Sequence, residues 1–277
     1  MTTRTPVYFL SHGGPNIMED TKHPAYAKLQ EIGHEITGKV KPKAIVVFSG
    51  HWQGFQDTIE VNTMESSPLI YDFYGFPAHY YEYKYPNKGS PELAEKILGM
   101  LQTAGIKAEG VRRGLDHGVW ASFMCLFDPK TNPLDIPIVQ VSLFDYFKAD
   151  LHFKLGKAIA SLREEGVQII VSGMAVHNLR DMGRMWGQPG ALDYTLSFDE
   201  ALREAVEQDP SSREEAMTQL LSRPDFKKAH PSADHLMPIY VGAGAASDEK
   251  ATRIFTLPEG SMSWAQFRFG EVGAPAS

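Results

Sequence analysis

The sequence places three histidines in the same local setting, shortly after a run of apolar residues: His12, His51 and His177. The runs that precede them are rich in β-branched, aromatic and large aliphatic residues: Val7–Leu10, Ala44–Ser49 and Val167–Ser172. Continuous apolar runs of this length are typical of strands buried on both faces. Because parallel strands bring their carboxyl ends to one edge of a sheet, where ligands bind, we expect the three imidazoles to lie close together.

Imidazoles gathered in this way could hold a metal ion. Neutral imidazole is the commonest metal ligand in proteins, and three such ligands leave coordination positions open for a substrate. A fourth histidine, His235, lies in the loop Ala229–Pro238, AHPSADHLMP, which opens a predicted helix. Two histidines from strand ends and one from this loop would form the metal site. The remaining histidine would act as an acid or base near neutral pH.

A structural role is the competing interpretation of each histidine taken singly, because a histidine after a strand is more often a hydrogen-bonded structural residue. The occurrence of three in one chain makes coincidence a poor explanation. The other histidines outside the motifs below lack this setting, and we expect surface or packing roles for them: His23, His34, His79 and His152.

The segments between these strands predict the elements that must position the histidines. Amphipathic or apolar helical patterns cover four segments: Pro24–Ile36, Pro91–Ala104, Gly118–Phe127 and Ala149–Glu164. Further strands are predicted at Lys107–Val111, Ile136–Leu143, Thr252–Thr256 and Met262–Phe269. Strands that alternate with helices predict an α/β fold with a mostly parallel central sheet, helices on both faces, and the metal site at the carboxyl ends of the strands. We expect one catalytic domain over residues 1–270 and a frayed tail over residues 271–277.

Composition narrows the class of partner. The chain has 277 residues, is 43% hydrophobic and carries a net charge of -7 without a basic run, so nucleic acid is not expected to bind. A single cysteine, Cys125, excludes an intrachain disulfide framework and fits a reducing compartment. No window approaches the roughly 20 apolar residues of a membrane span. We therefore expect a cytoplasmic protein that acts on a small molecule.

Five short motifs follow one another along the chain: SHGGP at Ser11–Pro15, SGHW at Ser49–Trp52, LDHGVW at Leu115–Trp120, SGMAVHNL at Ser172–Leu179 and HPSADHLMP at His230–Pro238. In this order they resemble the class III extradiol ring-cleavage dioxygenases. The sequence is most similar to the branch that resembles 4,5-DOPA extradiol dioxygenase, which is related to the catalytic subunit of protocatechuate 4,5-dioxygenase. The resemblance runs from Val7 to Phe269, and the ordered set of motifs is more specific than any one of them.

The resemblance implies that His12, His51 and His235 are the metal ligands. In the protocatechuate branch the third ligand is a glutamate, whereas the branch that this chain resembles uses histidine. That difference leaves a choice between His230 and His235, with Asp234 as a carboxylate in the same loop. The more constant part of the family motif is an acidic residue followed by a histidine. In this sequence that pair is Asp234 and His235, which favours His235 as the ligand. His230 would then line the entrance on the substrate side or cap the turn.

The resemblance also assigns the catalytic side chains. His177 would handle the proton of a substrate hydroxyl, and it would lie close enough to contact the metal when no substrate is bound. His117 would be a second pocket histidine, which binds substrate or stabilises oxygen, with Asp116 beside it on the substrate side. The competing interpretation of this pair is an N-terminal helix cap. The aromatic stretch Leu69–Tyr85, which includes Tyr74, would form either a pocket wall for a flat ring or a packed loop.

The implied reaction is the cleavage of a catechol ring beside its hydroxyl pair with O2, which gives a muconic semialdehyde. Fe(II) is the metal expected for activity, and Zn(II) is the alternative bound metal. The substrate would be DOPA-like or another substituted catechol, and we expect a monomer or a homodimer. Two other functions would use the same residues: a zinc-dependent hydrolase, or a non-catalytic binding protein of the Memo type, which is similar in fold.

Overall fold

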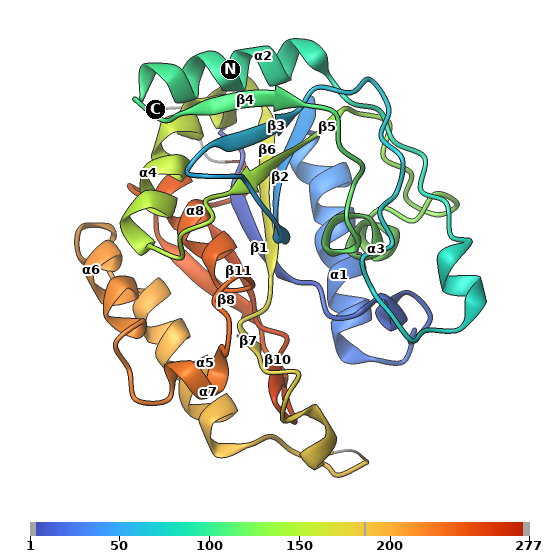
Figure 1. Cartoon of the computed structure of the whole chain (residues 1–277), viewed down its shortest axis with the longest axis vertical. Coiled ribbons are helices and arrows are strands. Elements are labelled where there is room, and N and C mark those ends of the chain that lie inside the picture. The colour runs from blue at the N-terminus through green and yellow to red at the C-terminus, as the bar shows by residue number, and fades with distance from the viewer. Residues whose placement is uncertain (1–3, 186, 274–277) are drawn as a thin grey trace.

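A computed structural model describes residues 4–185 and 187–273 (Figure 1). Within these residues, an eight-stranded sheet has the spatial order β4 (Ala108–Val111), β3 (Ile59–Asn62), β5 (Ile138–Leu143), β2 (Ala44–Gln53), β6 (Val167–Gly173), β1 (Val7–Ser11), β11 (Gln266–Phe269) and β8 (Ala251–Phe255). The four central strands β5, β2, β6 and β1 are parallel. Antiparallel pairings occur only toward the edges, at β3 with β5 and at β11 with β1 and β8. The mostly parallel sheet that the sequence predicts is confirmed.

Helices cover both faces of this sheet (Figure 1). One face carries α2 (Pro91–Thr103), α4 (Ala149–Ile159), α5 (Asp193–Val206), α6 (Pro210–Leu220), the short α7 (Phe226–Ala229) and α8 (Met237–Ala245). The other face carries α1 (Pro24–Glu35) and α3 (His117–Leu126). Because side chains alternate along a strand, Val7 and Phe9 belong to the first core, and Tyr8 and Leu10 belong to the second. Burial on both faces is the reason that β1 is a continuous apolar run.

A small second sheet lies at the carboxyl end of β6. It consists of β7 (Val176–His177), β10 (Met262–Ser263) and β9 (Pro258–Glu259). The sequence predicts one strand over Met262–Phe269, but the structure divides it. β10 pairs with β7 in the small sheet, whereas β11 pairs with β1 in the large one, so the chain changes sheets between them. Alternation of side chains does not reveal such a change of partner.

One helix boundary also differs from the prediction. The α-helix expected over Ala149–Glu164 ends at Ile159 and continues as a 3₁₀ helix, Ala160–Glu165. The predicted frayed tail, residues 271–277, lies mostly outside the described residues. Among the described helices, none is both long enough and apolar enough to cross a bilayer.

Candidate metal centre

Two of the three predicted ligands come from β1 and β2, the strands on either side of β6 in the parallel sheet. His12 directly follows β1, and its backbone N–H donates to the carbonyl of Gly173, at the end of β6, at 3.0 Å. The sequence predicts that β2 ends at Ser49, whereas the strand continues to Gln53. The pairing of β2 with β5 is irregular between Phe48 and Gln53, so His51 lies in a distorted part of the strand rather than beyond it.

The third ligand comes from the loop before α8, which lies on the end of β6. The carbonyl of His235 accepts a hydrogen bond from the backbone of Met174 at 2.9 Å. Gly173 permits this approach, because a Cβ atom there would lie 2.1 Å from the His235 carbonyl oxygen. The loop therefore depends on a small residue at the end of β6.

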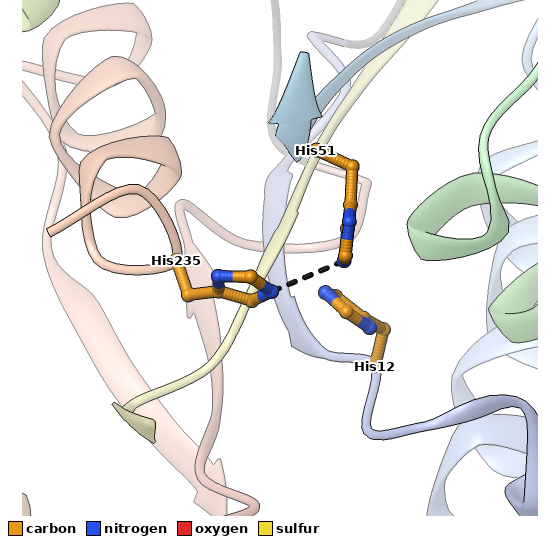
Figure 2. Close-up of side chains that lie close together, drawn as sticks. All are labelled: His12, His51 and His235. Carbon is orange, nitrogen blue, oxygen red and sulfur yellow. Dashed lines mark hydrogen bonds between the residues drawn. The ribbon is translucent and has the colours of Figure 1, made fainter. Parts of the chain in front are cut away.

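The three imidazoles point toward one another (Figure 2). The Nε2 atoms of His51 and His235 lie 3.1 Å apart, which is the dashed line in Figure 2. One ligand atom from each of His12, His51 and His235 lies within 4.8 Å of the other two. His12 and His235 are buried, and the side chain of His51 is 19% exposed. The site is thus enclosed, with limited access on the side of His51.

The hydrogen bonds of these rings show which nitrogen faces the centre. The Nδ1 atom of His12 lies 2.6 Å from the carbonyl of Gly13, and that of His235 lies 2.9 Å from an Asp234 oxygen. In His51, Nδ1 lies 3.1 Å from an oxygen of Asp72. Because carbonyl and carboxylate oxygens only accept, each Nδ1 carries the hydrogen, and each Nε2 of a neutral ring carries a lone pair.

Three inward lone pairs without a hydrogen donor are unfavourable unless a cation binds them. The Nε2 atom of His12 is buried and has no hydrogen-bond partner among the described residues. Imidazoles whose Nδ1 atoms are each bound to an acceptor are how proteins orient histidine ligands around a metal. The residues therefore fit a metal ion, and His12, His51 and His235 are the ones that could hold it.

The local electrostatics also favour a cation. Burial, followed by the charges of neighbouring histidines, places the pKa values of His12 and His235 well below the ordinary value, so both rings are neutral. Burial acts in the same direction on His51. However, the Asp72 hydrogen bond and the charges of Asp116, Asp72 and Asp234 outweigh it, and the pKa of His51 is raised. The acidic groups around His51 thus favour positive charge at the site, whether it is a proton or a metal ion.

His177 lies against the ligand set rather than within it. Its ring stacks on His235, with centroids 3.7 Å apart and planes 14° apart. The side chains of Asp234 and His235 lie close enough to His177 to share a metal ion with it. His12 and His51 do not belong to that group. Burial, and then the charges of His230, His51 and His117, lower the pKa of His177 to about 3. The ring is therefore uncharged at neutral pH and has a nitrogen that can accept a proton.

His117 begins α3 beside His51, with ring centroids 4.1 Å apart. A Cβ atom at Gly118 would lie 2.8 Å from the His51 ring, so the glycine allows the helix to approach. The His117 Nδ1–H donates to Asp72 Oδ1 at 2.8 Å, and the His117 backbone N–H donates to the same oxygen at 3.0 Å. Asp72 therefore contacts both His51 and His117.

Asp72 is the residue that sequence reasoning missed. It lies within the aromatic stretch Leu69–Tyr85, between Tyr71 and Phe73. Burial alone would raise its pKa, but the hydrogen bonds from His117 and His51 together place that pKa well below the usual range. The available signal was an aspartate surrounded by apolar aromatic residues, where an unpaired charge would be costly.

The three residues predicted to bind substrate have other contacts. The buried carboxylate of Asp116 accepts hydrogen bonds from Ser49, Arg113 and Gln140. It stands at the N-cap position of α3 but makes no side-chain capping bond. His230 is fully buried, and its Nε2–H donates to the carbonyl of Ala175 at 3.0 Å. Tyr74 is 90% exposed. None of these contacts is to a proposed metal ligand, and the substrate-binding roles of Asp116, His230 and Tyr74 stay predictions.

Comparisons with known proteins agree with this geometry. Residues 5–263 match the family model described as the catalytic LigB subunit of aromatic ring-opening dioxygenase. The chain is 36% identical over 266 residues to 4,5-DOPA dioxygenase extradiol of Beta vulgaris, covering 95% of each chain. It is 30% identical over 272 residues to the protein of that name from Escherichia coli K12, covering 97% of this chain and 96% of the relative. A crystal structure of an uncharacterized protein from Escherichia coli K12 superposes with a TM-score of 0.77 and 30% identity, covering 96% of this chain and 100% of that one.

These matches extend over nearly the whole chain and include the strand ends and the loop that carry the histidines. The resemblance predicted from the five motifs is confirmed. The chain belongs to the LigB family of aromatic ring-opening dioxygenases and is an extradiol dioxygenase.

Proposed function

We propose that this protein cleaves a catechol ring beside its two hydroxyl groups, with His12, His51 and His235 holding Fe(II). The observation that carries the proposal is the convergence of three Nε2 atoms whose rings are each fixed through Nδ1. A ferrous ion bound there would supply open positions for the catechol oxygens and dioxygen, and a route for electrons between them. Zinc would fit the same donors but has no redox chemistry.

The surrounding side chains would orient the ring and manage protons. His177, whose ring stacks on the proposed ligand His235, would take the proton of a catechol hydroxyl. His117 holds its hydrogen on Nδ1, which leaves Nε2 free to accept a hydrogen bond from substrate. The buried ring of Phe73 lies edge-on to His117, with centroids 5.5 Å apart, and would help to exclude water beside it. Both atoms of O2 would end in the ring-opened semialdehyde.

The substrate would be a DOPA-like or otherwise substituted catechol, as the names of the relatives suggest. The single catalytic domain over residues 1–270, the cytoplasmic location and a monomeric or homodimeric state stay predictions. The family match does not favour the zinc hydrolase or the non-catalytic binding protein as alternatives.

Oxygen uptake tests this proposal. Metal-free protein is loaded with Fe(II) under nitrogen and then mixed with a panel of substituted catechols in air-saturated buffer. We expect one O2 consumed per catechol and a yellow semialdehyde product, with neither event in zinc-loaded protein. Hydrolase activity of zinc-loaded protein under nitrogen, without any oxygen uptake by the iron form, would overturn the proposal.

A further inference from the structure

One carboxylate joins two histidines that have different proposed tasks. Asp72 Oδ2 lies 3.1 Å from the Nδ1 atom of His51, a proposed metal ligand. Asp72 Oδ1 lies 2.8 Å from the Nδ1 atom of His117, a proposed substrate residue. Among the described residues, the only ion-pair partners of Asp72 are these two imidazoles, and no lysine or arginine pairs with it. Its charge is thus directed into the site rather than toward a surface cation.

The segment that carries Asp72 is held on both sides. The Trp120 indole N–H donates to the carbonyl of Ile70 at 2.9 Å, which ties the segment to α3. The hydroxyl of Tyr71 donates to the carbonyl of Tyr83 at 2.7 Å, which closes the aromatic stretch on itself. On the other side, Phe73 is buried against Trp120 and His117. Asp72 is therefore fixed by its neighbours, and it can in turn fix the rings to which it bonds.

We propose that Asp72 is a shared positioning residue, which sets the tautomer and orientation of both the metal ligand His51 and the substrate residue His117. This inference rests on the proposed function, because the two tasks are those assigned above. A hydrogen on Nδ1 of each ring leaves Nε2 of His51 free for the metal and Nε2 of His117 free for the substrate. Loss of the carboxylate would affect both tasks at once.

A simpler role is available and must be separated from this one. Asp72 also accepts the backbone N–H of His117 at 3.0 Å, at the start of α3, and could act only as a helix cap. A cap would affect stability, but it would leave the tautomers of His51 and His117 and the turnover at saturating metal unchanged. The experiment therefore needs readouts other than stability.

Asp234 provides a matched control within the same site. Its Oδ1 lies 2.9 Å from the Nδ1 atom of His235 and also accepts the backbone N–H of the same residue. It thus supports one ligand and no second catalytic histidine by a side-chain hydrogen bond. Asp72→Asn and Asp234→Asn each remove one carboxylate that bonds a proposed metal ligand, but only Asp72→Asn also removes the bond to His117.

Nitrogen-15 NMR of histidine-labelled protein in the metal-free state is the first readout. We expect Asp72→Asn to move the ring nitrogen signals of both His51 and His117. Asp234→Asn should move those of His235 and, to a smaller extent through the lost charge, those of His51, while the signals of His117 stay unchanged. If Asp72→Asn does not fold, Asp72→Glu replaces it, because the longer side chain keeps the charge but cannot hold both rings in place. Movement of only one ring, or of neither, would overturn the proposal.

Metal affinity and turnover are the second readout. Competition with a coloured chelator should show Fe(II) and Zn(II) binding weakened by about 10- to 100-fold in both asparagine variants. At saturating Fe(II), kcat should fall by about tenfold or more in Asp72→Asn and by less in Asp234→Asn, which leaves His117 in place. In a His117→Ala background, Asp72→Asn should weaken metal binding but lower kcat no further. An independent loss of kcat in that background would contradict the shared role.

The two proposals fail in different ways. Wild-type protein that binds no metal or opens no catechol would refute the proposed function, while the NMR comparison of the metal-free chains would still decide how Asp72 acts on the two rings. Active wild-type protein with unchanged ring signals in Asp72→Asn would refute the role of Asp72 alone.

Discussion

Two kinds of buried histidine occur in this molecule. His152 is fully buried beside Phe144, donates from Nδ1 to the Lys148 carbonyl at 2.7 Å, and leaves Nε2 without a described partner. His230 is also fully buried, donates from Nε2, and leaves Nδ1 without a described partner. Neither belongs to a group that could hold a metal ion among the described residues.

The histidines of the metal centre differ from these two in arrangement rather than in burial. His12 resembles His152 in having one bonded nitrogen and one buried nitrogen without a partner. What distinguishes His12 is that its free nitrogen converges with those of His51 and His235. A buried histidine with an unpartnered nitrogen is therefore weak evidence for a site, and convergence of several such nitrogens is strong evidence.

The largest expected effect comes from removing a converging imidazole. His12→Ala should weaken Fe(II) and Zn(II) binding by at least 100-fold and abolish ring cleavage, because two remaining ligands cannot hold the ion in this geometry. Chelator competition and oxygen uptake measure the two losses. His230→Gln is the matched control, since it changes a buried histidine outside the centre and should bind metal as wild type does.

A smaller loss, confined to turnover, is expected for the histidine stacked on the ligand set. His177→Ala should bind metal within a few-fold of wild type, because His177 is not among the three converging ligands. Its kcat should fall by about 10² to 10⁴, the usual contribution of a positioned acid or base. Normal turnover in this variant would remove His177 from the proton path.

The glycine that allows the third ligand to approach should have an intermediate effect. Gly173→Ala would place a Cβ atom 2.1 Å from the His235 carbonyl oxygen, so the loop must shift, at a cost of about 1–3 kcal/mol. We expect metal binding to weaken by about tenfold and the melting temperature to fall. Gly99→Ala, in α2 with no atom within 4 Å of the added Cβ, is the control. It should leave metal binding unchanged and raise the melting temperature slightly, because alanine favours a helix over glycine.

The isolated histidines should affect acid stability and not chemistry. Burial lowers the pKa values of His152 and His230 to about 4, below the ordinary value. The unfolded chain therefore binds these protons first, and stability is lost as the pH falls from about 6.5 toward 4, by about 3 kcal/mol for each histidine.

Two substitutions keep the hydrogen bond and remove the titrating group. Asparagine at position 152 can replace the Nδ1 donor, and glutamine at position 230 can replace the Nε2 donor. Urea unfolding at pH 7 and pH 4.5 measures how much the free energy of unfolding falls in acid. We expect a smaller fall in His152→Asn and His230→Gln than in wild type, with oxygen uptake unchanged. If the free energy of unfolding falls as much in both variants as in wild type, neither histidine is buried in its neutral form.

The sequence alone predicts those elements of the fold that have a local hydrophobic pattern. The continuous apolar runs of β1, β2 and β6 predict buried parallel strands, and the ends of β1 and β6 lie within two residues of the prediction. The end of β2 differed, because an irregular pairing with β5 extends the strand beyond Ser49. Likewise, β10 and β11 look like one strand until their separate partners are known.

The site residues could be predicted from the sequence where a histidine follows a strand or belongs to a motif. They could not be predicted where a side chain's role depends on contacts with residues far away in the sequence. Asp72 acquires its partners from β2 and from α3, which are separated from it in the sequence by 21 and 45 residues respectively. No local period or spacing marks such a residue. His230 is the opposite case: its motif suggests a role in the site, which stays a prediction, and its ring is bonded to the backbone of Ala175.

Anomalous diffraction from crystals of Fe(II)-loaded protein grown under nitrogen tests the central claim most directly. We expect one iron peak about 2.1 Å from the Nε2 atoms of His12, His51 and His235, with Nδ1 of each ring still bonded to its oxygen acceptor. An iron peak bound through an Nδ1 atom, or one outside these three histidines, would contradict it.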